Sequence, residues 1–112
     1  MKSGIYHVHF RGGPAQNFGD GIVVFKDGAI NGGDVGYIYR GEFRTETNRI
    51  IATINAKRWN VVPNALINLN EFNLHIDAPA PIDDSRFSIT AQLEGQPHLN
   101  ISVTGEWLGE AS

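Results

Sequence analysis

Apolar and polar residues alternate along residues 35–59, which is the pattern of two strands that each bury one face. The apolar faces consist of Val35, Tyr37, Tyr39, Gly41 and Phe43 on the first strand and Ile50, Ala52, Ile54 and Ala56 on the second. A four-residue loop, Thr45-Glu46-Thr47-Asn48, predicts that Phe43 faces Ile50 and Tyr39 faces Ile54. Because a one-residue slip would set apolar against polar side chains, pattern and loop length together favour this hairpin.

A second hairpin is expected over residues 86–108. Its apolar positions are Phe87, Ile89, Ala91 and Leu93, followed by Leu99, Ile101, Val103, Gly105 and Trp107. A three-residue turn at 95–97 would align Leu93 with Leu99 and Ile89 with Val103. The polar outer face of this hairpin is expected to meet solvent.

Shorter alternating segments add the remaining strands. Tyr6, Val8 and Phe10 share the inner face of the first, and a second covers residues 19–26 before the hairpin signal Asp27-Gly28. A short strand over 29–32 follows. Residues 63–67 predict a short helical turn that leads into a strand ending near Pro79. The count of about eight strands predicts an all-β, small antiparallel eight-stranded barrel with a single domain, residues 1–112.

Composition narrows the chemistry. The 112 residues contain no cysteine and carry a net charge of −3, which removes disulfides and thiolate metal sites. The basic residues are scattered among acids, so direct nucleic-acid binding is not expected. The N-terminal residues lack the apolar core of a signal peptide, and no apolar run approaches the roughly 20 residues of a membrane helix. We therefore expect a cytoplasmic protein without membrane contact.

The predicted interior contains several small residues, at Gly41, Ala52, Ala56, Ala91 and Gly105. Either these interleave with large side chains to fill the barrel, or they leave a cavity for a small apolar, lipid-like ligand. The candidate lining residues are Tyr37, Tyr39, Phe43, Ile54, Phe87, Ile89, Ile101, Val103 and Trp107.

No group of residues predicts catalysis, a cofactor or a metal site. His7 and His9 lie on one strand face, but a zinc site needs a third protein ligand, and exposed face residues are the favoured interpretation. Asp83 and Asp84 are adjacent, so their side chains point to opposite faces of an extended chain and do not form an acid–base pair. A non-enzymatic binding protein is expected.

Three apolar residues fall on the outer face of the first long hairpin: Ile38, Ile51 and Trp59. In the expected register Ile38 lies across from Asn55, with Ile51 and Trp59 four residues away in opposite directions. Clustered exposed apolar residues mark interfaces, so these three form a candidate homodimer face.

The sequence also resembles a known family. The segments that carry the resemblance are Met1–Phe10, Gly19–Val24, Lys26–Asp34 and Tyr39-Arg40-Gly41. They are similar to the GrlR-like family, negative regulators of type III secretion gene expression in bacteria. The resemblance implies a lipocalin-like barrel that dimerises and represses by binding a transcriptional activator through an acidic loop. The matching loop is Thr45-Glu46-Thr47-Asn48, where Glu46 alone carries a negative charge.

Overall fold

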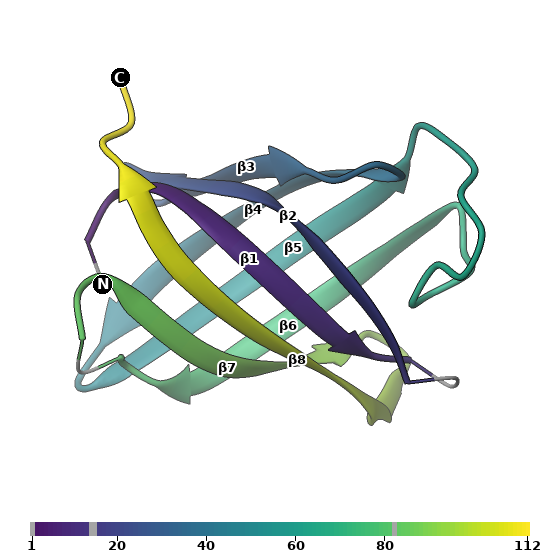
Figure 1. Cartoon of the computed structure of the whole chain (residues 1–112). Coiled ribbons are helices and arrows are strands. Elements are labelled where there is room, and N and C mark those ends of the chain that lie inside the picture. Colours follow the sequence, from purple (N-terminus) through teal and green to yellow (C-terminus); the bar gives the residue numbers. More distant parts are fainter. Residues whose placement is uncertain (1, 14–15, 82) are drawn as a thin grey trace.

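The chain forms a closed β-barrel in which each strand pairs with the next and the last pairs with the first (Figure 1). The computed structural model describes residues 2–13, 16–81 and 83–112. The strands are β1 (Gly4–Gly12), β2 (Asn17–Lys26), β3 (Ala29–Gly33), β4 (Tyr37–Glu46), β5 (Arg49–Arg58), β6 (Glu71–Pro79), β7 (Arg86–Leu93) and β8 (Gln96–Gly109). The expected all-β, eight-stranded antiparallel barrel is confirmed.

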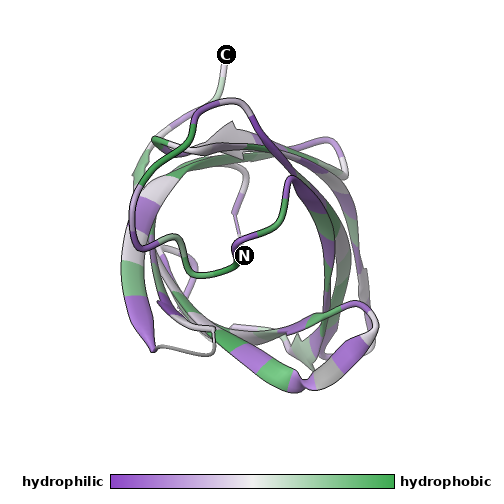
Figure 2. Cartoon of the chain, turned by 90° about the vertical axis from the view of Figure 1, so that its right-hand side faces the viewer, coloured by the Kyte–Doolittle hydropathy of each residue, from purple (hydrophilic) through white to green (hydrophobic). Residues whose placement is uncertain are grey.

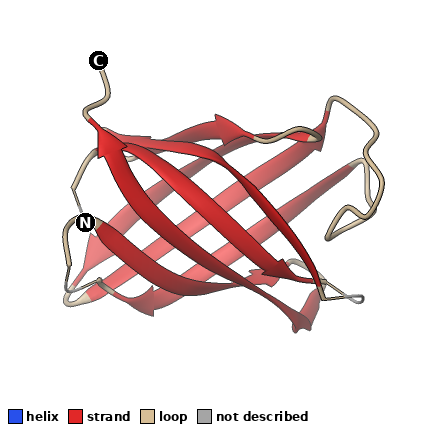
Figure 3. Cartoon of the chain, viewed as in Figure 1, coloured by secondary structure: helices blue, strands red, loops and turns tan. Residues whose placement is uncertain are grey.

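The helical turn expected at residues 63–67 is wrong. Residues 59–70 form turns and bends that cross the end of the barrel, and strands are the regular elements of the described ranges (Figure 3). The spacing of Val62, Ala65 and Leu66 results instead from a loop that turns apolar side chains toward the barrel interior. Ile67 is buried, and Ala65 and Leu66 pack against the core.

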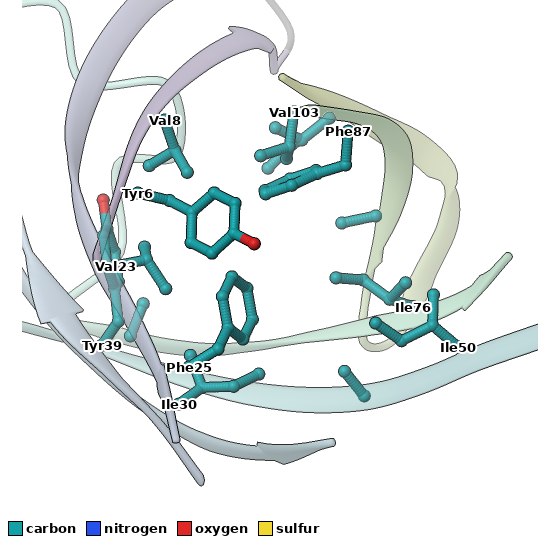
Figure 4. Packing of buried hydrophobic residues seen from close by; sticks show 14 of the residues in the cluster. Tyr6, Val8, Val23, Phe25, Ile30, Tyr39, Ile50, Ile76, Phe87 and Val103 are labelled. Carbon is teal, nitrogen blue, oxygen red and sulfur yellow. The ribbon is translucent and has the colours of Figure 1, made fainter. Parts of the chain in front are cut away.

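Alternation along the strands produces the core. Tyr6 and Val8 are buried and Phe10 is half-buried, as predicted for the first strand. Figure 4 shows buried aromatic rings meeting inside the barrel. The Phe25 ring centroid lies 5.3 Å from that of Tyr6 and 6.0 Å from that of Phe87. Edge-to-face pairs of this kind fill the barrel near the start of β1 and the end of β2.

The β4–β5 hairpin has the predicted faces but not the predicted partners. Phe43 lies opposite Ala52 rather than Ile50, because the turn consists of Thr47 and Asn48 alone. Asn48 has a φ of 59°, which is a conformation that asparagine tolerates. A shift of two residues keeps every side chain on its face, so alternation alone does not distinguish the two registers. Val35 precedes β4 and is exposed, so its predicted place on the inner face is wrong.

The β7–β8 hairpin follows the predicted register except near its turn. Ile89 lies opposite Val103, as predicted, whereas Leu93 lies opposite Gln96 and not Leu99. Glu94 and Gly95 form a two-residue turn in which Gly95 has a φ of +82°. The register shifts between Gln92 and Leu93, and this irregularity absorbs the extra residues.

Two ends of the barrel are now distinguishable. One end, which we call the mouth, is crossed by loop 59–70 and by the β3–β4 connection, at the right of Figure 1. The other end holds both termini and the turns at 27–28 and 47–48. Asp27 and Gly28 both have positive φ, which is the type I′ hairpin that the sequence predicts there. Figure 2 views the barrel from the mouth and shows the ring of strands.

Candidate functional site

A small apolar cavity lies in the barrel interior. Its volume is about 60 Å³, and its walls are aliphatic and aromatic side chains that include Tyr39, Ile54, Phe87, Ile89 and Val103 from the candidate lining. Pockets that hold drug-sized ligands have volumes of roughly 300–1,000 Å³. The large aromatic rings therefore leave room here for a group of a few atoms.

The other candidate lining residues lie elsewhere. Tyr37 and Ile101 line a second pocket at the mouth, and Phe43 packs against Phe25 with ring centroids 5.4 Å apart. Trp107 is half-buried near the chain terminus, where its Nε1 donates a hydrogen bond to the Ser3 carbonyl at 3.1 Å.

The mouth pocket has a volume of about 460 Å³ and lies between the strand ends and loop 59–70. Its apolar walls come from both sides, with Phe10 and Phe72 on the strands and Leu66 on the loop. Tyr37 holds the loop in place, because its hydroxyl lies 2.6 Å from the carbonyl oxygens of Ile67 and Leu69. The pocket is large enough for a small ligand.

Asp34 organises the rim of this pocket. Its Oδ1 accepts hydrogen bonds from the backbone N–H groups of Gly36 and Tyr37, both at 2.8 Å. Its Oδ2 accepts one from the Tyr39 hydroxyl, and its carbonyl oxygen accepts one from Trp59 Nε1 at 3.1 Å. Burial, and then the hydrogen bond to Asp34, raise the pKa of Tyr39 well above its ordinary value. An Asp side chain often accepts a hydrogen bond from the backbone N–H two residues on, and this local tendency is the sequence signal that could have identified Asp34.

Exposed apolar side chains gather around the mouth. They form a group that we call the mouth patch: Phe18, Ile22, Val35, Ile38, Trp59, Val61 and Leu69. Asn60 Nδ2 donates to the Val35 carbonyl and Trp59 N donates to the Gly36 carbonyl, which joins two of the contributing loops. Leu108 is the remaining exposed large apolar residue in the described part of the chain. This concentration at one end is typical of a contact surface.

The candidate dimer face is divided by the observed register. Ile38 lies opposite Lys57 rather than Asn55, and Ile51 lies opposite Arg44. Ile38 and Ile51 are thus separated by six residue positions along the strands, about 20 Å at 3.3 Å per residue. Ile38 and Trp59 belong to the mouth patch, and Ile51 does not.

Loop 45–48 lies at the opposite end of the barrel from the mouth. Thr45 and Glu46 end β4, Thr47 and Asn48 form the turn, and all four are exposed. Glu46 Oε1 forms an ion pair with Arg44 Nε at 2.8 Å. The one carboxylate of this loop is therefore partly neutralised by its own strand.

The histidines and acids singled out in the sequence occupy separate surface positions. His7 Nε2 lies 2.8 Å from Asp20 Oδ2, and the rings of His7 and His9 are 4.3 Å apart. Asp83 Oδ1 accepts hydrogen bonds from Ser85 N and Oγ, and these bonds lower the pKa of Asp83. Within residues 2–13, 16–81 and 83–112, no three His, Asp or Glu side chains come together as a metal site.

A closed antiparallel barrel of eight strands, with an apolar interior and exposed apolar side chains at one mouth, defines a small all-β barrel protein. A family model described as "T3SS negative regulator, GrlR" matches residues 1–111. The chain belongs to this family, which comprises negative regulators of type III secretion systems. No curated protein matches the chain. Within the described residues, no helix is long and apolar enough to cross a membrane.

Proposed function

We propose that this protein restrains type III secretion gene expression by binding a transcriptional activator through the mouth patch. The family membership supports the regulatory role. The observation that carries the proposed contact is the gathering of exposed apolar side chains at one end of the barrel. A net charge of −3 favours the approach of a basic, DNA-binding partner. We also propose that the protein acts in the cytoplasm.

Trp59 is the member of the mouth patch best suited to test this contact. Buried tryptophans are common energetic centres of interfaces, and their removal costs roughly 2 kcal/mol or more. We expect Trp59→Ser to weaken activator binding by at least about 30-fold, measured by calorimetry with the purified activator. A type III secretion reporter strain should then lose repression.

Leu108→Ser is the matched control, because Leu108 and Trp59 are both 58% exposed and Leu108 lies away from the mouth. This variant should bind and repress like the wild type. If Trp59→Ser binds the activator with unchanged affinity, the mouth patch is not the contact surface.

Loop 45–48 is the contact that the family resemblance proposes, and Glu46→Lys tests it separately. Reversal of this charge would weaken binding to a basic partner if the loop takes part. Unchanged binding by Glu46→Lys, together with weaker binding by Trp59→Ser, assigns the contact to the mouth alone.

We propose that the homodimer uses Ile38 of its candidate face, and that Trp59 of that face contacts the activator instead. Ile22 extends this surface, because Ile22 and Ile38 both lie opposite Gly33, which has no side chain. Sedimentation of wild type and Ile38→Ser at several concentrations tests the proposal. A wild type that stays monomeric at every concentration contradicts it.

The mouth pocket favours a second candidate function, binding of a small apolar ligand. Its volume of about 460 Å³ falls within the range of small-molecule sites. Native mass spectrometry of protein purified from its host should then show a co-bound molecule. Leu66→Arg would place a charge in this pocket and should remove the added mass.

A further inference from the structure

The barrel is closed unevenly, and its weakest seam lies between β6 and β7. Nine residue pairs join β5 to β6, but within the described residues only Leu74–Leu93 and His75–Gln92 join β6 to β7. In the part of the chain that the structure describes, residues 76–79 of β6 pair with β5 alone, and residues 86–91 of β7 pair with β8 alone. Two strand edges are therefore left unpaired between the end of β6 at Pro79 and the start of β7 at Arg86.

The direction of the backbone groups at these edges follows from strand geometry. In an antiparallel pair, both the N–H and the C=O of a residue point to the same side, and the side alternates along the strand. Glu94 N donates to the Asn73 carbonyl, so Asn73, His75 and Asp77 turn their backbone groups toward β7. By the same alternation, Ser88 and Thr90 face β6.

Continued pairing beyond His75–Gln92 would place Asp77 opposite Thr90, but this pair is not formed. Arg49 Nη2 donates to the Asp77 carbonyl at 3.2 Å, which satisfies one of the edge groups. Within the described residues, the backbone groups of Ser88 and Thr90 are directed into the seam without a partner on β6. Strand edges with unused donors and acceptors are templates for another extended chain.

A groove of about 760 Å³ lies over this seam. Its outer walls are polar and include Asp77, Ser88, Thr90 and Gln92. Ile76 and Ile89, from β6 and β7 respectively, line both this groove and the apolar interior cavity. The seam thus has a polar exterior and two backbone edges, and behind them lies a small apolar recess, the interior cavity of about 60 Å³.

We propose that the β6–β7 seam binds an extended segment of a partner protein by strand addition. The segment is about five residues long, because the unpaired edges span four to six residues. Side chains alternate between the two faces of a strand, so one small aliphatic side chain would enter the recess while its neighbours stay polar and face solvent. This inference rests on the proposed function only in taking the occupant to be part of a partner protein.

The features of the seam select this occupant over the alternatives. Another barrel of the same kind presents strands already paired on both sides over most of their length, whereas a free extended segment has both backbone edges available. A small apolar molecule would fill the recess and leave the donors and acceptors of Ser88 and Thr90 unused. A polypeptide backbone is the chemistry that complements both.

The test uses the full chain and a blocked synthetic peptide, Lys-Thr-Val-Thr-Val-Thr-Lys, followed by amide NMR. We expect the amide signals of Asp77, Ser88 and Thr90 to shift on titration, and hydrogen exchange at Ser88 and Thr90 to slow at least tenfold. A peptide N-methylated at alternate residues lacks the donors for one edge, and it should bind at least tenfold more weakly. This comparison needs no protein variant.

Two variants of Thr90 distinguish the role of its backbone N–H in peptide binding from the role of its side chain. Thr90→Pro removes the N–H directed into the seam and should weaken peptide binding at least tenfold. Thr90→Val keeps that N–H and should bind normally. Equal binding of the plain and N-methylated peptides, or unmoved Ser88 and Thr90 amides at saturation, would overturn the proposal. Concentration-dependent shifts of these amides without peptide would assign the seam to a second copy, and would overturn it as well.

The outcome is independent of the activator test. Trp59 lies at the mouth, so Trp59→Ser should leave peptide binding at the seam unchanged. Loss of activator binding in that variant, with no peptide bound at the seam, would reject strand addition and leave the proposed function intact. Peptide binding at the seam without any activator binding would support strand addition and reject the proposed activator contact.

Discussion

The β4–β5 and β6–β7 seams join neighbouring antiparallel strands of one barrel, yet ten residue pairs hold the first and two hold the second within the described residues. The connections between the strands explain the difference. A two-residue turn, Thr47-Asn48, forces pairing from the first residue of β5, whereas β6 ends at Pro79 before a loop that contains Pro81. Proline lacks the N–H that a ladder needs. A tight turn closes a seam, and a longer proline-containing connection lets it open.

The largest expected effect comes from breaking the closed seam. A Cβ on Gly41 would lie 2.2 Å from the Thr53 carbonyl oxygen and 3.0 Å from Ile54 Cα, both backbone atoms of β5. We expect Gly41→Ala to lower the free energy of unfolding by about 1–3 kcal/mol, because overpacking against backbone forces the strands apart. Urea unfolding followed by tryptophan fluorescence measures this loss.

The matched control for this change is Gly109→Ala, because a Cβ at Gly109 meets nothing within 4 Å. Its free energy of unfolding should stay within about 0.5 kcal/mol of the wild type. Equal unfolding midpoints for Gly41→Ala and Gly109→Ala would mean that β4 and β5 are less tightly apposed than the structure shows.

The sequence predicts the closed seam far better than the open one. Alternation assigns Tyr39 and Ala56 to the interior, but a two-residue shift preserves that alternation, so their pairing is decided by the turn at Asn48. The hydrophobic pattern does not reveal the open β6–β7 seam, because Ile89 takes its place in the apolar–polar alternation whether or not neighbouring residues pair with β6. The open seam differs in which backbone N–H and C=O groups form hydrogen bonds, and the sequence does not reveal this because nearly all residues carry the same backbone groups.

The mouth shows the same limit. Phe18 lies at the start of β2, whereas Val35 and Val61 lie in two different loops. The three are far apart in the sequence, and an isolated exposed apolar residue is ordinary. Their proximity depends on the closure of the barrel. Composition and strand pattern therefore predict the fold class, whereas the candidate contact surface requires the three-dimensional arrangement.

A smaller effect is expected where residues 83–85, just before β7, are bonded to the core. The Tyr6 hydroxyl lies 2.5 Å from the Lys2 carbonyl oxygen and 3.2 Å from that of Asp84, and the Tyr6 side chain is fully buried. We expect Tyr6→Phe to cost about 1 kcal/mol of unfolding free energy, the usual contribution of one hydrogen bond. Amide exchange in residues 83–85 should quicken.

Tyr39→Phe serves as the comparison for that change, since its hydroxyl bonds to Asp34 at the mouth. Amide exchange in residues 83–85 should be the same in Tyr39→Phe as in the wild type. If Tyr6→Phe also leaves that exchange unchanged, the Tyr6 hydroxyl does not hold residues 83–85 in place.

The smallest effect concerns the side chain of Glu94, which lies next to the two residue pairs that join β6 to β7. Glu94 Oε2 accepts a hydrogen bond from Asn73 Nδ2 at 2.9 Å, and its Oε1 lies 3.0 Å from His75 Nε2. The bond from Asn73, and then the one from His75, lower the pKa of Glu94 below its ordinary value of 4.5. A lowered folded-state pKa stabilises the fold above the unfolded value, and this contribution is lost as pH falls through the folded value.

Carboxyl NMR titration of Glu94 tests these side-chain hydrogen bonds directly. Asn73→Ala should raise the pKa of Glu94 toward 4.5, whereas Asn100→Ala, which alters the far side of the groove, should leave it unchanged. The Glu94 N to Asn73 carbonyl bond at 2.9 Å persists in Asn73→Ala, because it uses backbone atoms alone. An unshifted pKa would show that the Asn73 side chain does not bond to the Glu94 carboxylate, which leaves the backbone bond as the described contact between these two residues. The open and closed seams would then differ only in how far the same ladder extends.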